Sequence, residues 1–517
     1  MSAASRVKAV TLPLQQSSLL SRNVGSCCYY SFAAAARSLP GQTERWRAPL
    51  SRGAGATATR AWRVEGLRWN SSASSSSSSN SSSSSSSSSS AASEDGESVA
   101  SSQTSLGSGS GIGGEAQPAA TAFAFAFDID GVLLHTSKPI PGATETLRFL
   151  QRNNIPFILL TNGGGKPEAE RVADLAEKLG VELDVSNFVQ SHTPFQRLLD
   201  PDVDLGYPLL EQYLEQSLGR KRFTAKDTVL VLGSDASKAR RIANGYGFES
   251  VVTPGDILKA CPEIFPFDPL REFYDRQETL PLPKPIYNPK ADPAMRLEDC
   301  LKIDGILTFN DPRDWAVDVQ LITDLMLSHR GYLGTFSSKN NDRTPPRDKW
   351  WQSDGQPPII FSNVDLQWST GYHMSRLGQG SFRGAVRQTM KSLARGWRLR
   401  DVKTFEFGKP SGPTYAYAWD TLERYRRRLG LPDLKAVYMV GDNPSSDIAG
   451  ALTWNSCLEK QKSPGPYWKS CLVRTGVWRE DVAPIDRLYN KPTHAVDDVR
   501  AAVQRALDEQ KWPGKFE

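Results

Sequence analysis

From Phe123 onward the chain alternates short apolar runs with amphipathic stretches, and this alternation limits the fold more than any other feature of the sequence. The run AFAFAFDID at residues 122–130 predicts a buried strand, and TETLRFLQRN at 144–153 predicts a helix. IPFILLTN at 155–162 predicts a second strand, and EAERVADLAEKLG at 168–180 has apolar residues at helical spacing. Strands that alternate with helices indicate an α/β fold, with a Rossmann-like, mostly parallel sheet covered on both faces.

Two segments of different composition precede this region. Residues 1–70 are rich in Arg, Ser and Ala and contain only two acidic residues, Glu44 and Glu65, which is typical of a mitochondrial transit segment. The alternative is an unstructured basic tail. Residues 71–121 are dominated by Ser and Gly and predict a disordered linker, because they offer too little apolar surface to fold. We therefore expect a mitochondrial protein, located in the matrix.

The formal net charge of +5 comes from the start of the chain. Ten Lys or Arg residues lie within residues 1–70, whereas the part that follows residue 121 is near neutral. A near-neutral folded part argues against a nucleic-acid partner, although a local basic patch could lie within it. No stretch reaches the ~18 apolar residues that a transmembrane helix requires, so we expect no membrane-spanning segment.

Polar side chains follow several of the apolar runs, where an open parallel sheet binds its ligands. Asp128 and Asp130 follow the first strand, Thr161 and Asn162 the second, and Asp442 follows KAVYMVG at 435–441. A further strand is predicted for SCLVRTG at 470–476. Clustered carboxylates would repel one another without a cation, and oxygen ligands suit Mg²⁺. The sequence therefore predicts a magnesium site at this edge of the sheet.

Four motifs at these positions, taken together, resemble those of the haloacid dehalogenase superfamily. They are DIDGVL at 128–133, LLTNGG at 159–164, GKP at 408–410 and GDNPSSD at 441–447, and the resemblance extends over residues 122–517. It implies a phosphatase in which Asp128 attacks phosphorus to form an aspartyl-phosphate. It also implies that Asp130 first protonates the leaving oxygen and later deprotonates the attacking water.

The same resemblance implies the remaining roles. Thr161 and the backbone amides near Asn162 and Gly163 would bind the phosphoryl oxygens, and Lys409 would offset their negative charge. The implied metal ligands are Asp128, Asp130, Asp442 and Asp447, where Asp447 holds the metal's waters or orients Lys409. The structural alternative is that these residues cap turns or form an ordinary surface ion pair.

The long stretch between the second and third motifs implies a large inserted α/β cap domain. We expect the catalytic core at residues 122–163 and 405–517, and the cap at 164–404. Within the cap, residues 228–247 predict a strand, turn and helix, residues 318–328 a helix, and PPIIFSNVDLQW at 357–368 a strand that ends in a turn. Asn363 and Asp365 in that turn are candidate substrate contacts by resemblance, and the alternative is that they only form the turn.

Three longer segments narrow the resemblance. GGGKPE at 163–168, residues 309–328 and GDNPSSDIAGA at 441–451 resemble the mitochondrial group called cat eye syndrome critical region protein five. Members of that group are hydrolase-like, and some are linked to glycerophospholipid synthesis.

Three hypotheses about function follow. The first is a Mg²⁺-dependent mitochondrial phosphatase that acts on a small phosphorylated metabolite, with a homo-oligomer possible. The second is a protein that keeps this fold and binds phosphate or a lipid precursor but turns over weakly. The third is an RNA-binding factor, suggested by YRRRLG at 425–430, which we interpret instead as the solvated face of a helix.

Overall fold

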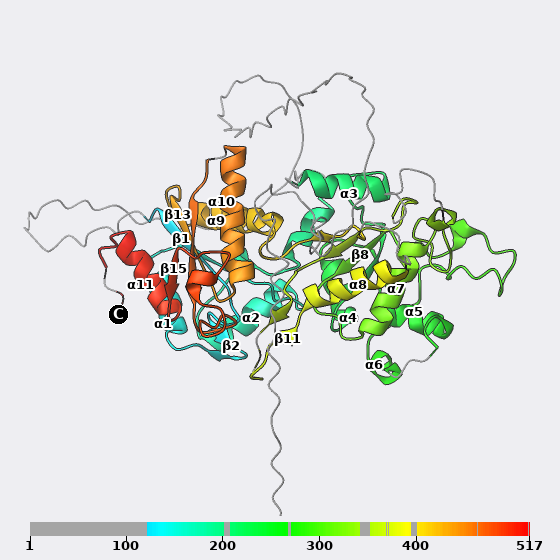
Figure 1. Ribbon diagram of the computed structural model, residues 1–517, viewed down its shortest axis with the longest axis horizontal. Coiled ribbons are helices and arrows are strands. Elements are labelled where there is room, and N and C mark those ends of the chain that lie inside the picture. Colours follow the sequence, from blue (N-terminus) through cyan, green and yellow to red (C-terminus); the bar gives the residue numbers. More distant parts are fainter. Residues whose placement is uncertain are drawn as a thin grey trace, which may run out of the picture. The chain divides into compact units, whose positions relative to one another are not determined.

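The computed structural model describes residues 121–517, except 201–206, 267–269, 342–351, 369, 371, 394–400, 463, 515 and 517. The predicted transit segment at 1–70 lies outside the described residues, as does the predicted linker except for its last residue. The fold is α/β and contains two parallel sheets with helices on their faces (Figure 1).

The first sheet has six parallel strands in the order β15-β14-β13-β1-β4-β5. Their bounds are β1 Phe123–Phe127, β4 Phe157–Leu160, β5 Phe188–Val189, β13 Ala436–Gly441, β14 Tyr467–Val473 and β15 His494–Val496. The predicted strands near 122–130, 155–162, 435–441 and 470–476 are thus confirmed. The central position of β1 between β13 and β4 explains why all five of its residues are buried.

Because Phe and Ala alternate in β1, the strand has large side chains on one face and small side chains on the other. The phenylalanines pack against α1 Ala143–Arg152, α2 Glu168–Leu179 and α11 Val499–Glu509. Ala124 and Ala126 face the opposite side, where α9 Gly412–Arg428 and α10 Ala449–Gln461 bring large aromatic side chains such as Tyr415 against the sheet. Because side chains alternate between the faces of a strand, small residues on one face leave room for these bulky helices.

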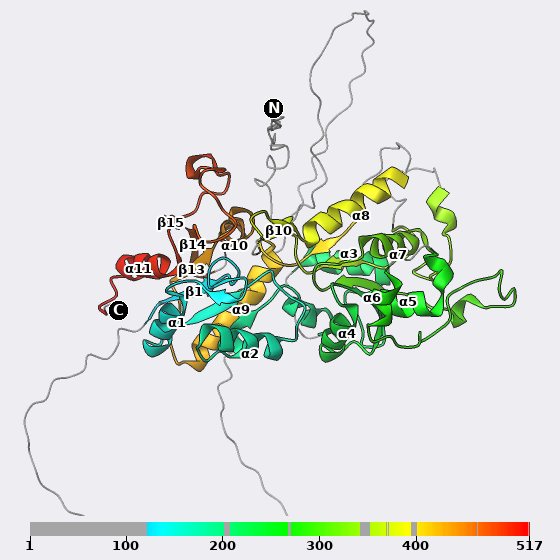
Figure 2. The same ribbon diagram turned by 90° about the horizontal axis from the view of Figure 1, so that it is seen from below.

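The second sheet has five parallel strands in the order β12-β9-β8-β6-β7. Their bounds are β6 Thr228–Leu232, β7 Ser250–Val252, β8 Gly305–Thr308, β9 Ile359–Phe361 and β12 Phe405–Glu406. One face packs on α3 Pro208–Leu218 and α4 Ala236–Gly245. The other packs on α5 Pro254–Ala260, α7 Trp315–Leu327 and α8 Gln379–Leu393, while α6 Arg271–Asp275 adds Tyr274 to that core (Figure 2). The predicted cap strands and helices are confirmed.

Two hairpins and several short helical turns complete the described part. The hairpins are β2 Leu134–His135 with β3 Lys138–Pro139, and β10 Gln367–Trp368 with β11 Arg376–Leu377. The short turns are η2 Val185–Asn187, η3 Thr193–Leu198, η4 Pro262–Ile264, η5 Leu297–Asp299, η6 Ser338–Asn341, η8 Pro444–Ile448 and η9 Ile485–Arg487.

Both boundaries between core and cap differ from the predicted ones when they are drawn by strand pairing and packing. The core was expected to break at 163/164, but α2 packs into the first core and β5 pairs with β4, so this part continues to Val189. The chain was expected to return from the cap to the core at 404/405. This boundary lies later in the sequence, because β12 Phe405–Glu406 pairs with β9 of the second sheet. Two-residue strands carry too little periodicity to be recognised from sequence.

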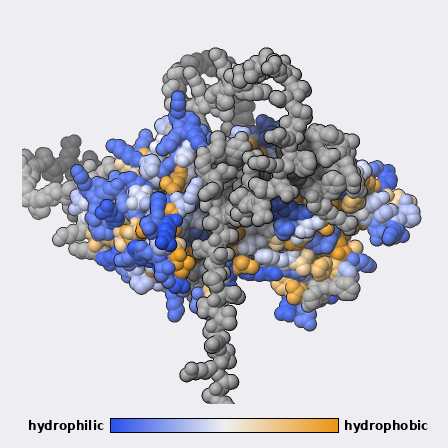
Figure 3. Space-filling model, in the orientation of Figure 1, coloured by the Kyte–Doolittle hydropathy of each residue, from blue (hydrophilic) through white to orange (hydrophobic). Residues whose placement is uncertain are grey.

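The described surface is mostly hydrophilic on the face shown in Figure 3, with apolar patches between polar side chains. This mixture is usual for protein surfaces. Among the helices of the described part, none combines the length and apolar character needed to cross a bilayer.

Candidate active site

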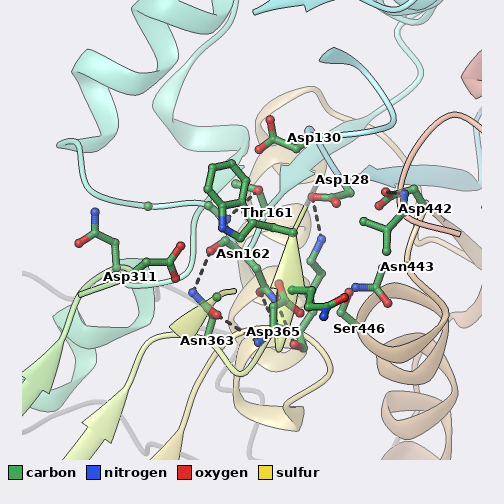
Figure 4. Close-up of a pocket in the computed structure, with 18 of the residues that line it drawn as sticks. Asp128, Asp130, Thr161, Asn162, Asp311, Asn363, Asp365, Asp442, Asn443 and Ser446 are labelled. Atoms are coloured by element: carbon green, nitrogen blue, oxygen red, sulfur yellow. Dashed lines mark hydrogen bonds and ion pairs between the residues drawn. The ribbon is translucent and has the colours of Figure 1, made fainter. Parts of the chain in front are cut away.

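Three neighbouring strands bring the predicted site residues together. In the order β13-β1-β4, Asp442, Asp128 and Thr161 all follow carboxyl ends at the same edge of the sheet. The backbone N–H of Asp128 donates to the carbonyl oxygen of Val440 at 2.9 Å, which ties the turn after β1 to β13. Figure 4 shows Asp128, Asp130 and Asp442 gathered on one side of the pocket.

Asp128, Asp442 and Asp447 form a buried acidic group. One carboxylate oxygen from each residue lies within 4.8 Å of the other two. Three hard oxygen ligands at such spacing fit a divalent cation such as Mg²⁺, which takes few carboxylates and keeps several waters. The carboxylate of Asp130 is not part of this group. The metal-binding role predicted for Asp130 therefore stays a prediction.

Lys409 joins two of these carboxylates. Its Nζ lies 2.8 Å from Oδ1 of Asp128 and 2.7 Å from Oδ1 of Asp447, and it donates to the carbonyl oxygen of Leu160 at 2.9 Å. Lys409 is only 1% exposed. Burial alone would lower its pKa, but the two carboxylates hold the pKa of Lys409 above its ordinary value. The side chain is therefore a fixed positive charge beside the candidate nucleophile.

Asp130, Asp442 and Asp447 have raised pKa values because they are buried near other carboxylates. Burial, followed by the charges of Asp128 and Asp447, raises the pKa of Asp442 well above its ordinary value. Burial also raises the pKa of Asp447 to about 6, although Lys409 opposes the shift. Burial and then the charge of Asp128 raise the pKa of Asp130. A group of carboxylates that resists ionisation is one that a cation would stabilise.

Two glycines make room for Asp442. Gly131 has φ +89°, and a Cβ there would lie 2.4 Å from Oδ2 of Asp442. At Gly476 the corresponding distance is 1.9 Å, and the next residue, Val477, donates its backbone N–H to the same oxygen at 2.5 Å. Any larger residue at either glycine would displace the carboxylate, so the glycine of DIDG has a steric role at the metal end of the site.

Asn162 connects the second and third motifs. Its Oδ1 accepts from the backbone N–H of Lys409 at 2.7 Å, and its Nδ2 donates to the Lys409 carbonyl oxygen at 2.9 Å and to Oδ2 of Asp365 at 2.8 Å. The backbone N–H of Gly163 donates to Oγ1 of Thr161 at 3.0 Å. The Gly163 amide, one of the backbone amides predicted to bind the phosphoryl oxygens, is thus engaged within the loop, and the Asn162 side chain holds the loop against Lys409.

Asn363 and Asp365 form the predicted turn after β9 and reach the core. The backbone N–H of Asp365 donates to Oδ1 of Asn363 at 3.2 Å, and Nδ2 of Asn363 donates to the carbonyl oxygen of Asn162 at 3.2 Å. Burial raises the pKa of Asp365 to about 7. These bonds favour the alternative that Asn363 and Asp365 form the turn. The two residues also connect the second sheet to the loop of Asn162 by hydrogen bonds.

A cavity of about 360 Å³ opens over this group. All of the predicted site residues except Asp447 line it, and Asp447 lies behind Lys409. Sequence reasoning missed several other lining residues, which are Thr136, Gly164, Lys166, Arg171, Asn310, Asp311, Arg313, Gln367, Trp368, Gly378, Asn443, Ser446 and Val477. Some of these follow strands β8 and β14, so the same rule of strand ends could have found them.

Comparison with known proteins agrees with the four motifs. A family model described as haloacid dehalogenase-like hydrolase matches residues 125–249, and a second, HAD-hydrolase-like, matches residues 406–502. A mitochondrial hydrolase of Saccharomyces cerevisiae is 35% identical over 402 residues, which cover 74% of this chain and 94% of that protein. The chain belongs to the haloacid dehalogenase-like hydrolases.

This hydrolase is similar to two further proteins. A cardiolipin synthase (CMP-forming) / mitochondrial hydrolase fusion protein of Schizosaccharomyces pombe is 35% identical over 380 residues, covering 73% of this chain and 52% of the fusion. A hypothetical protein of Pyrococcus horikoshii OT3 aligns in structure over 75% of this hydrolase and 99% of its own chain, at 17% identity and a TM-score of 0.44. The sequence relatives, with their higher identity, decide the family.

Proposed function

We propose that this hydrolase is a Mg²⁺-dependent mitochondrial phosphatase that cleaves a small phosphorylated metabolite through an aspartyl-phosphate on Asp128. The observation that carries the proposal is the pairing of a buried carboxylate with a buried cation: Asp128 lies 2.8 Å from Lys409, and both line the cavity. Phosphoryl transfer depends chiefly on positioning and on positive charge around the phosphate, and this arrangement supplies both.

The chain's own residues divide the work. Asp128 attacks phosphorus while Lys409, 2.8 Å away, holds the attacking carboxylate in place. Asp130, whose raised pKa keeps it able to carry a proton, protonates the departing oxygen and then takes a proton from the water that hydrolyses the intermediate. The Thr161 hydroxyl accepts from Gly163, so its own proton is available to a phosphoryl oxygen.

Asp128, Asp442 and Asp447 would hold the magnesium ion, which supplies positive charge to the phosphoryl oxygens when bound. Residues outside the four motifs would select the substrate, because Asn310, Arg313 and Trp368 also line the cavity. Asn363 and Asp365 also line the cavity, and we keep them as proposed substrate contacts. Their hydrogen bonds with Asn162 hold them in position.

The location and substrate class draw on the relatives and on the first residues of the chain. The relative from S. cerevisiae is named a mitochondrial hydrolase, and in S. pombe a mitochondrial hydrolase is fused to cardiolipin synthase. Together with the basic segment at 1–70, these names support a mitochondrial location, within which the matrix is the compartment that we propose. The fusion supports a substrate from glycerophospholipid metabolism.

The test is release of inorganic phosphate from a generic aryl phosphate by the purified chain. Activity should require Mg²⁺, disappear with EDTA, and be lost in Asp128→Asn. Asp486→Asn, which neutralises an exposed carboxylate far along the chain, is the matched control and should keep wild-type activity. Turnover that persists in Asp128→Asn would refute the proposed nucleophile.

The second candidate is a binding protein with little turnover, favoured by how completely hydrogen bonds engage Asn162 and Gly163. It predicts saturable binding of inorganic phosphate in the presence of Mg²⁺ without phosphate release from any of a panel of phosphorylated metabolites. Release from one member of the panel at a physiological rate would exclude it.

A further inference from the structure

The hairpin of β10 and β11 exposes an unusual number of large apolar side chains. We call residues 366–378, which contain β10 and β11, the apolar hairpin. Its exposed residues are Leu366 (58%), Trp368 (38%), Tyr372 (53%), Met374 (57%) and Leu377 (56%). These are five of the fifteen exposed large apolar residues in the described part of the chain, within twelve positions. Apolar side chains gathered in this way mark an interaction surface.

The apolar hairpin adjoins the candidate active site. Gln367, Trp368 and Gly378 line the cavity, so the hairpin forms part of its mouth. It also leads directly into α8, whose start lies beside β11 in Figure 1 and beside β10 in Figure 2. A surface that binds the hairpin would therefore lie next to the opening of the cavity.

The hairpin and the residues after it are strongly basic. Residues 366–400 contain seven Lys or Arg and not one Asp or Glu, although the part of the chain after residue 121 is near neutral as a whole. Arg383 pairs with Glu406, and Arg387 and Lys391 pair with Asp401. Arg376 is exposed, lies over the Tyr372 ring at 4.7 Å, and has no carboxylate partner among the residues that the structure describes.

We propose that the apolar hairpin docks on an anionic phospholipid bilayer. Leu366, Met374 and Leu377 would enter the boundary between headgroups and acyl chains, and Arg376 would contact the anionic headgroups. Three of the five exposed side chains are not aromatic, which favours this partner over single-stranded nucleic acid, because nucleic acid binds through aromatic stacking. Docking goes beyond the proposed phosphatase activity and does not depend on it. If both hold, the mouth of the cavity lies close to phosphate groups at the bilayer surface.

Co-sedimentation of the full chain with lipid vesicles tests the proposal. We expect binding to vesicles of phosphatidylcholine mixed with phosphatidylglycerol, weaker binding at high salt, and little binding to phosphatidylcholine alone. Combined Leu366→Ser, Met374→Ser and Leu377→Ser should weaken binding at least about tenfold, because each buried aliphatic side chain contributes. Arg376→Gln should weaken it about fivefold, which corresponds to ~1 kcal/mol for one basic residue at the surface.

The matched control removes exposed apolar side chains elsewhere, with Val482→Ser and Tyr489→Ser, and should bind as the wild type does. Every variant should keep wild-type hydrolysis of a soluble aryl phosphate and a wild-type unfolding temperature. Unchanged vesicle binding by the triple variant would overturn the proposal, as would binding to single-stranded RNA with none to vesicles. A chain that binds vesicles through the hairpin but hydrolyses no phosphate would instead overturn only the phosphatase.

Discussion

Replacing Lys409 by Met should destabilise the metal-free protein strongly and in a pH-dependent way. Lys409 is 1% exposed and contacts two carboxylates, at 2.8 Å and 2.7 Å. Removing one partner from a buried ion pair leaves an uncompensated charge and costs about 3–5 kcal/mol. We therefore expect Lys409→Met to lower the free energy of unfolding by about that amount at about pH 8 in EDTA.

The direction of the pH dependence follows from the carboxyls left behind. The pKa of Asp447 is already about 6 in the folded protein, above the value of ~3.9 for an unfolded Asp, and loss of Lys409 would raise it further. A folded state that binds more protons than the unfolded state loses stability as pH rises. The stability deficit of Lys409→Met, meaning its lower free energy of unfolding relative to the wild type, should therefore be smaller at about pH 5 than at about pH 8.

Chemical unfolding of wild type and variant in EDTA at both pH values measures this deficit. Lys302→Met is the matched control, because Lys302 lies 2.6 Å from Asp304 but its side chain is 41% exposed. Exposed pairs contribute about 0–1 kcal/mol, so the control should lose no more than that. Equal losses for the two variants, or a loss for Lys409→Met that does not change with pH, would refute the reasoning.

Three further predictions concern the acids and their glycine. In EDTA the wild type should lose stability as pH rises through about 6, because burial raises the pKa of Asp447 in the folded protein. Added Mg²⁺ should stabilise the protein more at high pH than at low pH, and thermal unfolding across pH checks both outcomes. Asp130→Asn should lower kcat about 10²–10⁴-fold while Mg²⁺ affinity measured by calorimetry stays near wild type, and equal losses of both would contradict the assignment. Gly476→Ala should weaken Mg²⁺ affinity, because its Cβ would lie 1.9 Å from Asp442, whereas Gly245→Ala, with open space around its Cβ, should behave as wild type in the same titration.

The sequence alone was enough to predict which site residues follow the strands of the first sheet. Apolar runs followed by Asp128, Thr161 and Asp442 are local signals, and parallel strands place their carboxyl ends at one edge whatever their separation along the chain. The run AFAFAFDID likewise predicted a buried strand, which the structure confirms in β1.

Only the tertiary structure decided which of these acids share one centre and what surrounds them. It brings Asp128, Asp442 and Asp447 within 4.8 Å of one another and leaves the Asp130 carboxylate outside that group. It also assigns Asn162 to the Lys409 loop, 247 positions away in the sequence. Periodicity and propensity describe neighbours along the chain, whereas hydrogen bonds and close approaches between distant segments depend on how whole sheets and helices pack.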